Sequence, residues 1–393
     1  MLKRLTAGLV LCLVIALTAS LATSAIDHKK NKNDLYRQVE LFSDSLAIVE
    51  AEYVDEPEAR NLIYGALKGM ISSLDPHSQF LDPDSYNELK IDTEGRFGGI
   101  GIEITIKDGI LTVVTPIEDT PAWKAGVKSG DGIVKINDES TRDMTLTEAV
   151  KKLRGKPQEA VNITILRNAQ NKLLDFKIVR DIIKIKDIKE ARILEDHVGY
   201  IRLVEFRENT PVDFDIALKK LQKQSMNALI LDLRNNPGGL LDIAVRVTEK
   251  FIEKGKLIIY TKGRKVSSDM EFLSDYKTPI LNLPLVVLIN EGSASGSEIV
   301  AAALQDYKRA IIIGTKSFGK GSVQTLIPLS DGSALRLTTA HYFTPSGKQI
   351  HNKGVEPDIV VENTKKEKSD YKSDNQVMRA IDLLRAVRRY EKT

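Results

Sequence analysis

Cysteine is nearly absent from this chain of 393 residues, which contains one, Cys12. It lies behind a leucine in an apolar run, which is not the setting of a lipidated cysteine. If that run is removed, no thiol remains, which excludes a disulfide framework, a cysteine nucleophile and a thiolate metal site. Histidines are also few and lack a paired ligand spacing; they stand at positions 28, 77, 197, 341 and 351. We therefore expect neither a metal nor another cofactor.

An excess of charge of one sign is lacking as well. The 57 basic and 54 acidic residues give a net charge of +3, and they are interleaved along the chain. Loss of Lys3 and Arg4 with the first 25 residues would leave 55 basic and 54 acidic residues, a net charge of +1. Because nucleic acid is bound through a basic patch or stripe, this balance argues against a nucleic-acid partner.

The longest apolar run is at the amino terminus. Lys3 and Arg4 precede a nearly unbroken apolar stretch from Leu5 to Leu17, and small residues follow up to Ala25. This order is that of a secretory signal peptide, and the run is short for spanning a bilayer. We expect residues 1–25 to be a cleaved export signal, with an uncleaved membrane anchor as the alternative. The mature protein would then work in the periplasm or elsewhere outside the cytoplasm.

Changes of residue pattern divide the rest of the chain into four segments. They are a helical region at 26–90, a segment rich in glycine and β-branched residues at 91–180, an alternation of strands and helices at 181–362, and a charged linker with a short helix at 363–393. Apolar residues recur at helical spacing in 34–53 and again in 375–389. We expect these apolar faces to pack on another subunit, which makes the protein a homo-oligomer.

Three features within residues 91–180 occur in a fixed order. A glycine turn leads into an alternating strand, residues 121–126 predict a short helix ended by glycine, and Thr145 is placed to cap an amphipathic helix that ends at Leu153. The ordered set resembles a PDZ domain, which binds a peptide carboxyl terminus by strand addition. By this resemblance the carboxylate would be bound by backbone N–H groups of the glycine turn, where glycine permits the required dihedral angles. That loop comprises Gly99, Ile100, Gly101 and Ile102.

Predicted strands and helices alternate from Val198 onward, and residues 285–289 are apolar at every position. Continuously apolar strands are expected where helices cover both faces of a sheet. The predicted fold class is therefore α/β, with the PDZ domain inserted between the amino-terminal helices and the α/β core.

Small residues crowd the turn that follows the strand at 285–289. A turn of this kind, between a buried strand and a helix, exposes a side chain to a cleft, and the N–H groups at the start of the helix stabilise an anion. Ser293, Ser295 and Ser297 are the candidate nucleophiles in this run. The alternative interpretation is that the serines only cap the helix, a role that suits Ser297 best.

Lys320 stands between two glycines after the apolar strand predicted at 310–313. A serine–lysine dyad requires an uncharged amine that accepts the hydroxyl proton. Since an ordinary lysine has a pKa of about 10.4, burial would have to lower that pKa by roughly 3 units, or about 4 kcal/mol. The flanking glycines would let Lys320 enter a cleft, whereas the alternative is an ordinary solvated lysine. Gln324 is placed to orient the amine by a hydrogen bond.

Three motifs together resemble the carboxyl-terminal processing, or tail-specific, serine peptidases. They are the serine run of 292–299, the Gly-Lys-Gly-Ser-Val-Gln string of 319–324, and Asp-Leu-Arg-Asn-Asn-Pro-Gly-Gly at 232–239. Segments 338–347 and 354–358 also match the family's pattern, and the resemblance extends from about residue 35 to 390. The chain departs from the usual pattern at Phe318 and at Gly296, where alanine is frequent.

The resemblance implies a role for each site residue. Ser295 would be the nucleophile, Lys320 the general base, and Gln324 the residue that positions the base. The oxyanion hole would use the N–H of Gly296 and one N–H from Gly238 or Gly239. Asp232 and Arg234 are expected to form a structural pair. Arg154, at the end of the predicted groove helix, is the candidate contact through which the PDZ domain gates the core, which would have a crotonase- or ClpP-like arrangement.

The predicted function is that of a serine endopeptidase that recognises the carboxyl-terminal tails of exported proteins through its PDZ domain. The expected partners are protein substrates with apolar carboxyl termini, together with a possible adaptor protein. One alternative is a non-catalytic PDZ scaffold on a crotonase-like core. The other is an acyl-CoA enzyme, which rests on analogy of fold and which the export signal argues against, because acyl-CoA is cytosolic.

Overall fold

The computed structural model describes residues 34–107, 109–167, 172–362 and 370–390. The predicted signal segment, the spacer after it and most of the charged linker lie outside these ranges. None of the helices in the described ranges is long and apolar enough to cross a membrane. The chain divides into two compact units, residues 1–80 and 81–393.

The described part of the first unit is mainly helical. Residues 34–52 form one helix, α2 (Ala59–Ser72) forms the next, and the short strand β1 (Gln79–Leu81) follows. Tyr64 of α2 packs edge to face against Phe80, with ring centroids 4.9 Å apart. The first helix leaves a set of large apolar side chains exposed in this chain: Leu35, Tyr36, Val39, Leu41, Phe42, Ile48 and Val49.

The second unit begins with α3 (Pro83–Glu94). Proline fixes the first helical residue, the Asp82 side chain accepts a hydrogen bond from the Ser85 N–H, and Gly95 ends the helix at a φ of 66°. Strand β2 (Arg96–Gly99) then pairs antiparallel with β9 (Asp181–Lys184). This pair joins the entry and the exit of the predicted PDZ segment.

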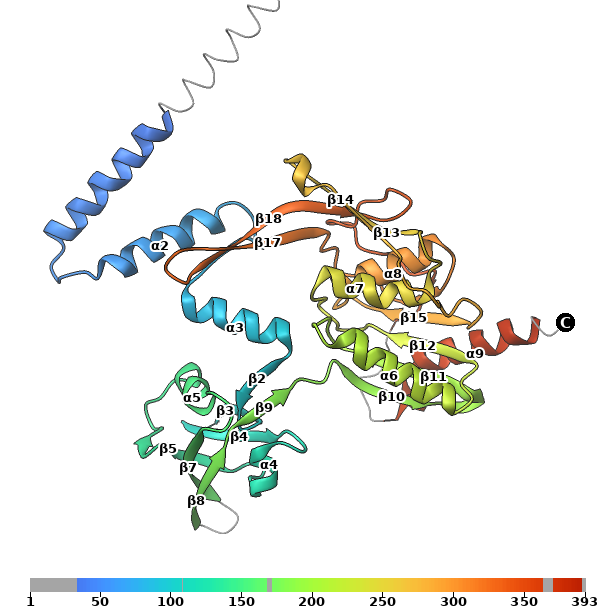
Figure 1. The fold of residues 1–393 in the computed structure, drawn as a ribbon, viewed down its shortest axis with the longest axis horizontal. Coiled ribbons are helices and arrows are strands. Elements are labelled where there is room, and N and C mark those ends of the chain that lie inside the picture. Colours follow the sequence, from blue (N-terminus) through green and yellow to red (C-terminus); the bar gives the residue numbers. More distant parts are fainter. Residues whose placement is uncertain (1–33, 108, 168–171, 363–369, 391–393) are drawn as a thin grey trace, which may run out of the picture. The chain divides into compact units, whose positions relative to one another are not determined.

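The predicted PDZ segment is an antiparallel sheet with two helices (Figure 1). The strand order is β3-β4-β5-β7-β8 with β6 on β5, and the bounds are β3 (Ile102–Lys107), β4 (Ile110–Pro116), β5 (Gly132–Ile136), β6 (Glu139–Ser140), β7 (Ala160–Arg167), β8 (Lys172–Val179), α4 (Pro121–Ala125) and α5 (Leu146–Leu153). Ile133, Val161 and Ile165 are fully buried in its own apolar cluster. The predicted cap at Thr145 is confirmed, because the Thr145 hydroxyl and the Glu148 carboxylate close a reciprocal capping box.

The α/β core is a sheet in the order β10-β11-β12-β15-β16-β19. The bounds are β10 (Ile188–Ile193), β11 (Val198–Leu203), β12 (Ala228–Asp232), β15 (Leu285–Ile289), β16 (Ile311–Gly314) and β19 (Ile359–Val360). Of these described strands only β10 pairs antiparallel, and β11 through β19 are parallel. β15 is apolar and buried at every position because both faces of the sheet are covered, as the sequence predicted.

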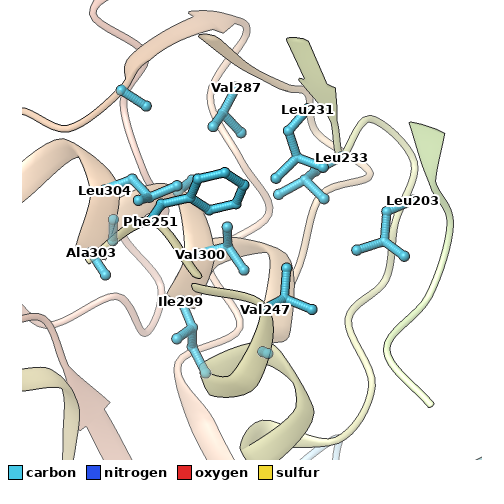
Figure 2. Packing of buried hydrophobic residues seen from close by; sticks show 14 of the residues in the cluster. Leu203, Leu231, Leu233, Val247, Phe251, Val287, Ile299, Val300, Ala303 and Leu304 are labelled. Atoms are coloured by element: carbon cyan, nitrogen blue, oxygen red, sulfur yellow. The ribbon is translucent and has the colours of Figure 1, made fainter. Parts of the chain in front are cut away.

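Helices cover one face of this sheet. They are α6 (Thr210–Lys223), α7 (Leu241–Thr248), the short η3 (Glu249–Phe251) and α8 (Gly296–Asp306). Figure 2 shows how side chains from the strands, such as Leu231 and Val287, point toward Val300 of α8 and Phe251. All four side chains are fully buried. This layer fixes the start of α8 against the ends of β12 and β15.

The other face is covered by α9 (Asn375–Tyr390), which follows the short η5 (Tyr371–Ser373). Val377, Ile381 and Leu384 of α9 pack with Ile230 and Leu288 of the strands. The prediction that the apolar face of 375–389 packs on another subunit is therefore wrong, because the chain's own sheet covers it.

A second antiparallel sheet lies beside the core and carries the segment after Lys320. Its strands include β13 (Leu257–Gly263), β14 (Met270–Leu273), β17 (Ser322–Pro328) and β18 (Ala334–Phe343). The short helices η2 (Glu195–His197) and η4 (Val266–Ser268) lie elsewhere in the unit. β18 pairs with both β13 and β17. The ladder between β17 and β18 slips by one residue between Val323 and Gln324.

Candidate active site

Ser295 occupies a strained turn between β15 and α8. Its φ of 54° and ψ of −113° lie in a region that residues other than glycine rarely adopt. The turn is possible because Gly238 lies against it: a Cβ at position 238 would lie 2.6 Å from Ser295 Cβ and 2.8 Å from the Gly296 nitrogen. Ser295 itself is only half buried. The geometry therefore presents this hydroxyl at the end of the parallel strands.

The two neighbouring serines are engaged elsewhere. The Ser293 hydroxyl donates to the Leu233 carbonyl at 2.8 Å, and the Ser297 hydroxyl donates to the Asn236 carbonyl at 2.9 Å. Both side chains are fully buried. Ser297 thus holds the turn after β12 instead of capping α8, and neither serine has the exposure that a nucleophile needs.

The hydroxyl of Ser295 pairs with a tyrosine that the sequence did not single out. Ser295 Oγ and Tyr342 Oη lie 3.1 Å apart, and Tyr342 is 2% exposed. Burial raises the pKa of Tyr342 to about 12, although the hydrogen bond with Ser295 acts in the opposite direction. Tyr342 therefore carries its proton at neutral pH.

A buried carboxylate joins the Ser295 turn to the segment that carries Lys320. Glu298 Oε2 accepts hydrogen bonds from the N–H of Ser295 and from the N–H of Lys320, each at 2.9 Å. Its Oε1 accepts from the Ser317 hydroxyl at 2.5 Å and from the Gly319 N–H at 2.7 Å. Burial raises the pKa of Glu298, and these four hydrogen bonds act against that rise.

Lys320 is half buried and lies in the turn between β16 and β17. Burial lowers its pKa, the nearby charge of Arg336 lowers it further, and the Glu298 carboxylate acts in the opposite direction. The direction is the one that a general base requires. In this structure the hydrogen-bond partner of Ser295 Oγ is Tyr342, and no hydrogen bond joins it to Lys320 Nζ.

Gln324 lies on β17 immediately after the ladder irregularity. Its side-chain amide donates to the Ser322 hydroxyl at 2.9 Å and to the Thr338 hydroxyl at 3.5 Å. The structure therefore places Gln324 near the start of β17 without a hydrogen bond to the Lys320 amine.

The glycines predicted for the oxyanion hole differ in how their N–H groups are used. The Gly238 N–H donates to Asn236 Oδ1 at 2.9 Å. Within the part of the chain that the structure describes, the N–H groups of Gly239 and Gly296 have no such partner. Asn236 is fully buried, and its carbonyl also accepts from the Ala294 N–H at 3.0 Å, so it ties the turn after β12 to the Ser295 turn.

The turn after β12 is anchored by a buried ion-pair network. Arg234 binds Asp232 through two hydrogen bonds of 2.9 and 2.6 Å, as expected for a structural pair. Asp232 also accepts from the Tyr200 hydroxyl at 2.7 Å. The other side of Arg234 meets Gln376 and Asp374 at the start of α9, at 2.7 and 2.8 Å. The helix that covers the sheet thus also completes this network.

The predicted carboxylate-binding loop of the PDZ segment connects β2 and β3. Ile100 is buried in the PDZ core, and Gly101 has a φ of +78°. A Cβ at position 101 would lie 2.3 Å from Thr120 Cβ. The carbonyls of Ile100 and Gly101 accept from Ala122 and Ile117, whereas their own N–H groups donate to no described residue. Two backbone donors are therefore available in this loop.

Arg154, the predicted gate, contacts α3. It forms a short ion pair with Glu88, and its guanidinium lies 4.5 Å from the centre of the Phe97 ring. The structure therefore brings Arg154 to the helix before the PDZ segment and does not bring it to Ser295 or Lys320.

Tyr342 and Glu298 are the site residues that sequence reasoning missed. For Glu298 a signal was present, since Ser295-x-x-Glu298 has the spacing of a capping box. Tyr342 lies in segment 338–347, which matches the family's pattern, but nothing in that segment singled it out. The residue pattern of that segment does not specify the strand register that brings Tyr342 to Ser295.

An α/β core that presents a serine at a strained turn beside a lysine, joined to a PDZ-like sheet, defines a PDZ-containing serine hydrolase. The chain's similarities agree with this class. Residues 197–361 match peptidase family S41, residues 112–167 match the PDZ domain, and residues 13–85 match the N-terminal domain of the activating protease CtpB.

Known relatives carry the same assignment. A carboxy-terminal-processing protease of Bartonella bacilliformis is 48% identical over 342 residues, which cover 86% of this chain and 78% of that protein. A probable CtpA-like serine protease of Staphylococcus aureus is 35% identical over 81% of this chain, which spans 64% of that relative's length. The solved photosystem II D1 C-terminal processing protease is 30% identical, with a TM-score of 0.47 and coverage of 82% of this chain and 92% of that one. The identity with the Bartonella bacilliformis protein, which covers most of both chains, shows that the chain belongs to peptidase family S41, the carboxy-terminal-processing serine proteases.

Proposed function

We propose that this serine protease is an exported endopeptidase that cleaves peptide bonds with Ser295 as nucleophile and Lys320 as general base. The observation that carries the proposal is the pair of hydrogen bonds to Glu298 Oε2. One oxygen atom holds the backbone of the strained serine turn and the backbone of the lysine. The lowered pKa of Lys320 has the direction that the role requires.

The reaction that we propose begins at the Ser295 hydroxyl. The Ser295 hydroxyl gives its proton to Lys320 Nζ while Oγ attacks the peptide carbonyl, and Lys320 returns the proton to the departing amine as the C–N bond breaks. Water, deprotonated by Lys320, then hydrolyses the ester on Ser295. The N–H groups of Gly296 and Gly239 would stabilise the oxyanion, and that of Gly238 would join them on release from Asn236. Gln324 would orient the Lys320 amine once it moves toward Ser295.

The PDZ domain would select substrates by their carboxyl termini. Ile100 and Gly101 would offer a carboxylate two N–H donors that bind no described residue. The edge of β3 beside α5 would receive the substrate as an added strand with apolar side chains. Arg154, held by Glu88 in this structure, would pass the binding event toward the core. The core would have the crotonase- or ClpP-like arrangement that the sequence suggested.

The proposal also includes the compartment in which the enzyme acts and the proteins that it binds. The signal-like residues 1–25 would direct the protein to the periplasm or another extracytoplasmic compartment. The exposed apolar side chains of helix 34–52 would pack on a second copy, and an adaptor would bind elsewhere. Sequencing the amino terminus of the mature protein tests export, and analytical ultracentrifugation tests the oligomer.

The decisive experiment is cleavage of an unfolded protein that ends in apolar residues. We expect Ser295→Ala and Lys320→Ala to abolish cleavage while circular dichroism stays unchanged. Lys316→Ala is the matched control, because Lys316 lies in the same turn, is mainly exposed and pairs with Glu356. A fluorophosphonate probe should label wild type at Ser295. Full activity of either site variant would refute the dyad.

A further inference from the structure

Tyr342 touches the reacting atom of the proposed nucleophile and also the turn that carries the proposed base. Its hydroxyl lies 3.1 Å from Ser295 Oγ. Its backbone N–H donates to the Gly321 carbonyl at 3.0 Å, one residue after Lys320. The residue sits in β18 opposite Thr261 of β13, so its backbone is fixed from both sides. No other described side chain is hydrogen-bonded to Ser295 Oγ.

We infer that Tyr342 is a catalytic residue whose hydroxyl donates a hydrogen bond to Ser295 Oγ during acyl transfer. The inference rests on the proposed function, because it takes Ser295 as the nucleophile. Tyr342 keeps its proton throughout, so it is neither a base nor a nucleophile. Its contribution is to fix Oγ in position and to stabilise the negative charge that develops there.

The direction of the hydrogen bond decides which proton is available. Ser295 has a single hydroxyl proton, and if it were donated to Tyr342 it would not be available to the base. When Tyr342 donates instead, Ser295 Oγ accepts, and the serine proton is left for Lys320 Nζ. Tyr342 is suited to donate because it is 2% exposed and remains protonated at neutral pH.

The same hydrogen bond serves both halves of the reaction. In acylation the hydrogen bond from the Tyr342 O–H makes the serine hydroxyl more acidic. The serine proton moves to Lys320 while Oγ bonds to the carbonyl carbon. In hydrolysis of the ester, the C–Oγ bond breaks, the electron pair stays on Oγ, and Lys320 returns the proton to it. Tyr342 stabilises Oγ as the leaving group in that step.

Tyr342→Phe tests the inference, since it removes the hydroxyl and keeps the ring in its buried site. We expect kcat to fall by about 10- to 100-fold with KM nearly unchanged, the size of one hydrogen bond gained in the transition state. The rate of fluorophosphonate labelling of Ser295 should fall in parallel. The pH midpoint of kcat should stay in place, because Lys320 and not Tyr342 titrates.

Tyr307→Phe is the matched control. Tyr307 is another tyrosine against the same core, and its hydroxyl donates to the Leu257 carbonyl at 2.8 Å. The melting temperature of Tyr307→Phe should fall by about as much as that of Tyr342→Phe, whereas its kcat should not change. A Tyr342→Phe variant with wild-type kcat and labelling would overturn the inference, and a faster variant would show that Tyr342 restrains the serine. Absence of labelling in wild type would instead refute the proposed function.

Discussion

Ser295, the proposed nucleophile, depends on its surroundings for its backbone conformation. Its left-handed backbone is held by the hydrogen bond from its N–H to Glu298 and by the close approach of Gly238. Strain of this kind costs about 1–3 kcal/mol and persists only where the surroundings determine it. The strain and the exposure of Ser295, set against the full burial of Ser293 and Ser297, distinguish it from its neighbours better than the sequence does.

A pH-dependent stability is expected from Lys320. Its pKa in the folded protein lies below its ordinary value of 10.5, so the folded state binds fewer protons than the unfolded state between these values. The free-energy cost of the charged lysine in the folded state is fully present below the folded pKa. This cost disappears as the pH rises to 10.5. Lys320→Met should therefore raise the melting temperature at pH 7, and the gain should shrink toward pH 10.

Thermal unfolding of the variant and wild type from pH 6 to 10 checks this expectation. Lys316→Met is the control, because Lys316 is mainly exposed and should show no such trend. A gain for Lys320→Met that is the same at every pH would contradict a lowered pKa of Lys320 in the folded protein.

The roles at residue scale were only partly readable from the sequence. Ser295 and Lys320 stood out because glycines surround each of them at the end of an apolar strand. The direction of the Gln324 side chain could not be predicted, because the ladder slips at that residue. A slip of one position changes the face on which a strand side chain lies. Tyr342 was missed because its contact spans 47 positions and depends on a register that no local pattern specifies.

At the scale of elements, the conformation of the proposed carboxylate-binding loop of the PDZ domain depends on Gly101. Gly101→Ala would place a Cβ 2.3 Å from Thr120 at a φ of +78°. We expect the PDZ free energy of unfolding to fall by about 2 kcal/mol or more, and binding of apolar carboxyl-terminal peptides to weaken. Urea unfolding followed by fluorescence of Trp123, the only tryptophan, reports on this domain.

Gly126→Ala separates strain from clash in the same domain. Gly126 has a φ of +88°, but a Cβ at this position would meet no described atom within 4 Å. Gly126→Ala should therefore lower the PDZ free energy of unfolding only by the backbone strain, about 1 kcal/mol. Equal losses for the two variants would mean that Thr120 moves aside. Unchanged peptide binding by Gly101→Ala would remove this loop from the recognition site.

The elements themselves were more predictable than their contacts. Apolar strands such as β15, and the capping box at Thr145, follow from composition and short-range spacing. For 375–389 the periodicity correctly indicated an apolar face. Periodicity does not state what covers a face, and the covering surface is formed by strands much earlier in the chain, such as β12 and β15.

At the scale of the whole molecule, α9 is part of the core. Leu384 is 2% exposed against the sheet, so Leu384→Ala should lower the free energy of unfolding by about 2–4 kcal/mol. Circular dichroism should show an earlier melt of the core, while Trp123 fluorescence still reports a native PDZ domain. Leu383→Ala, at a partly buried neighbour, should cost less. Equal and small effects would show that α9 is dispensable.

The hydrogen bond between Arg234 and Gln376 of α9 can form only late in the synthesis of the chain. Gln376 follows Arg234 by 142 positions, which at usual rates of synthesis is a delay of about 7–28 s. Until then the arginine beside the Asn-Asn-Pro-Gly-Gly turn lacks two of its partners. A growing chain therefore carries the turn after β12 with an incomplete ion-pair network, which is completed only after α9 has been synthesised.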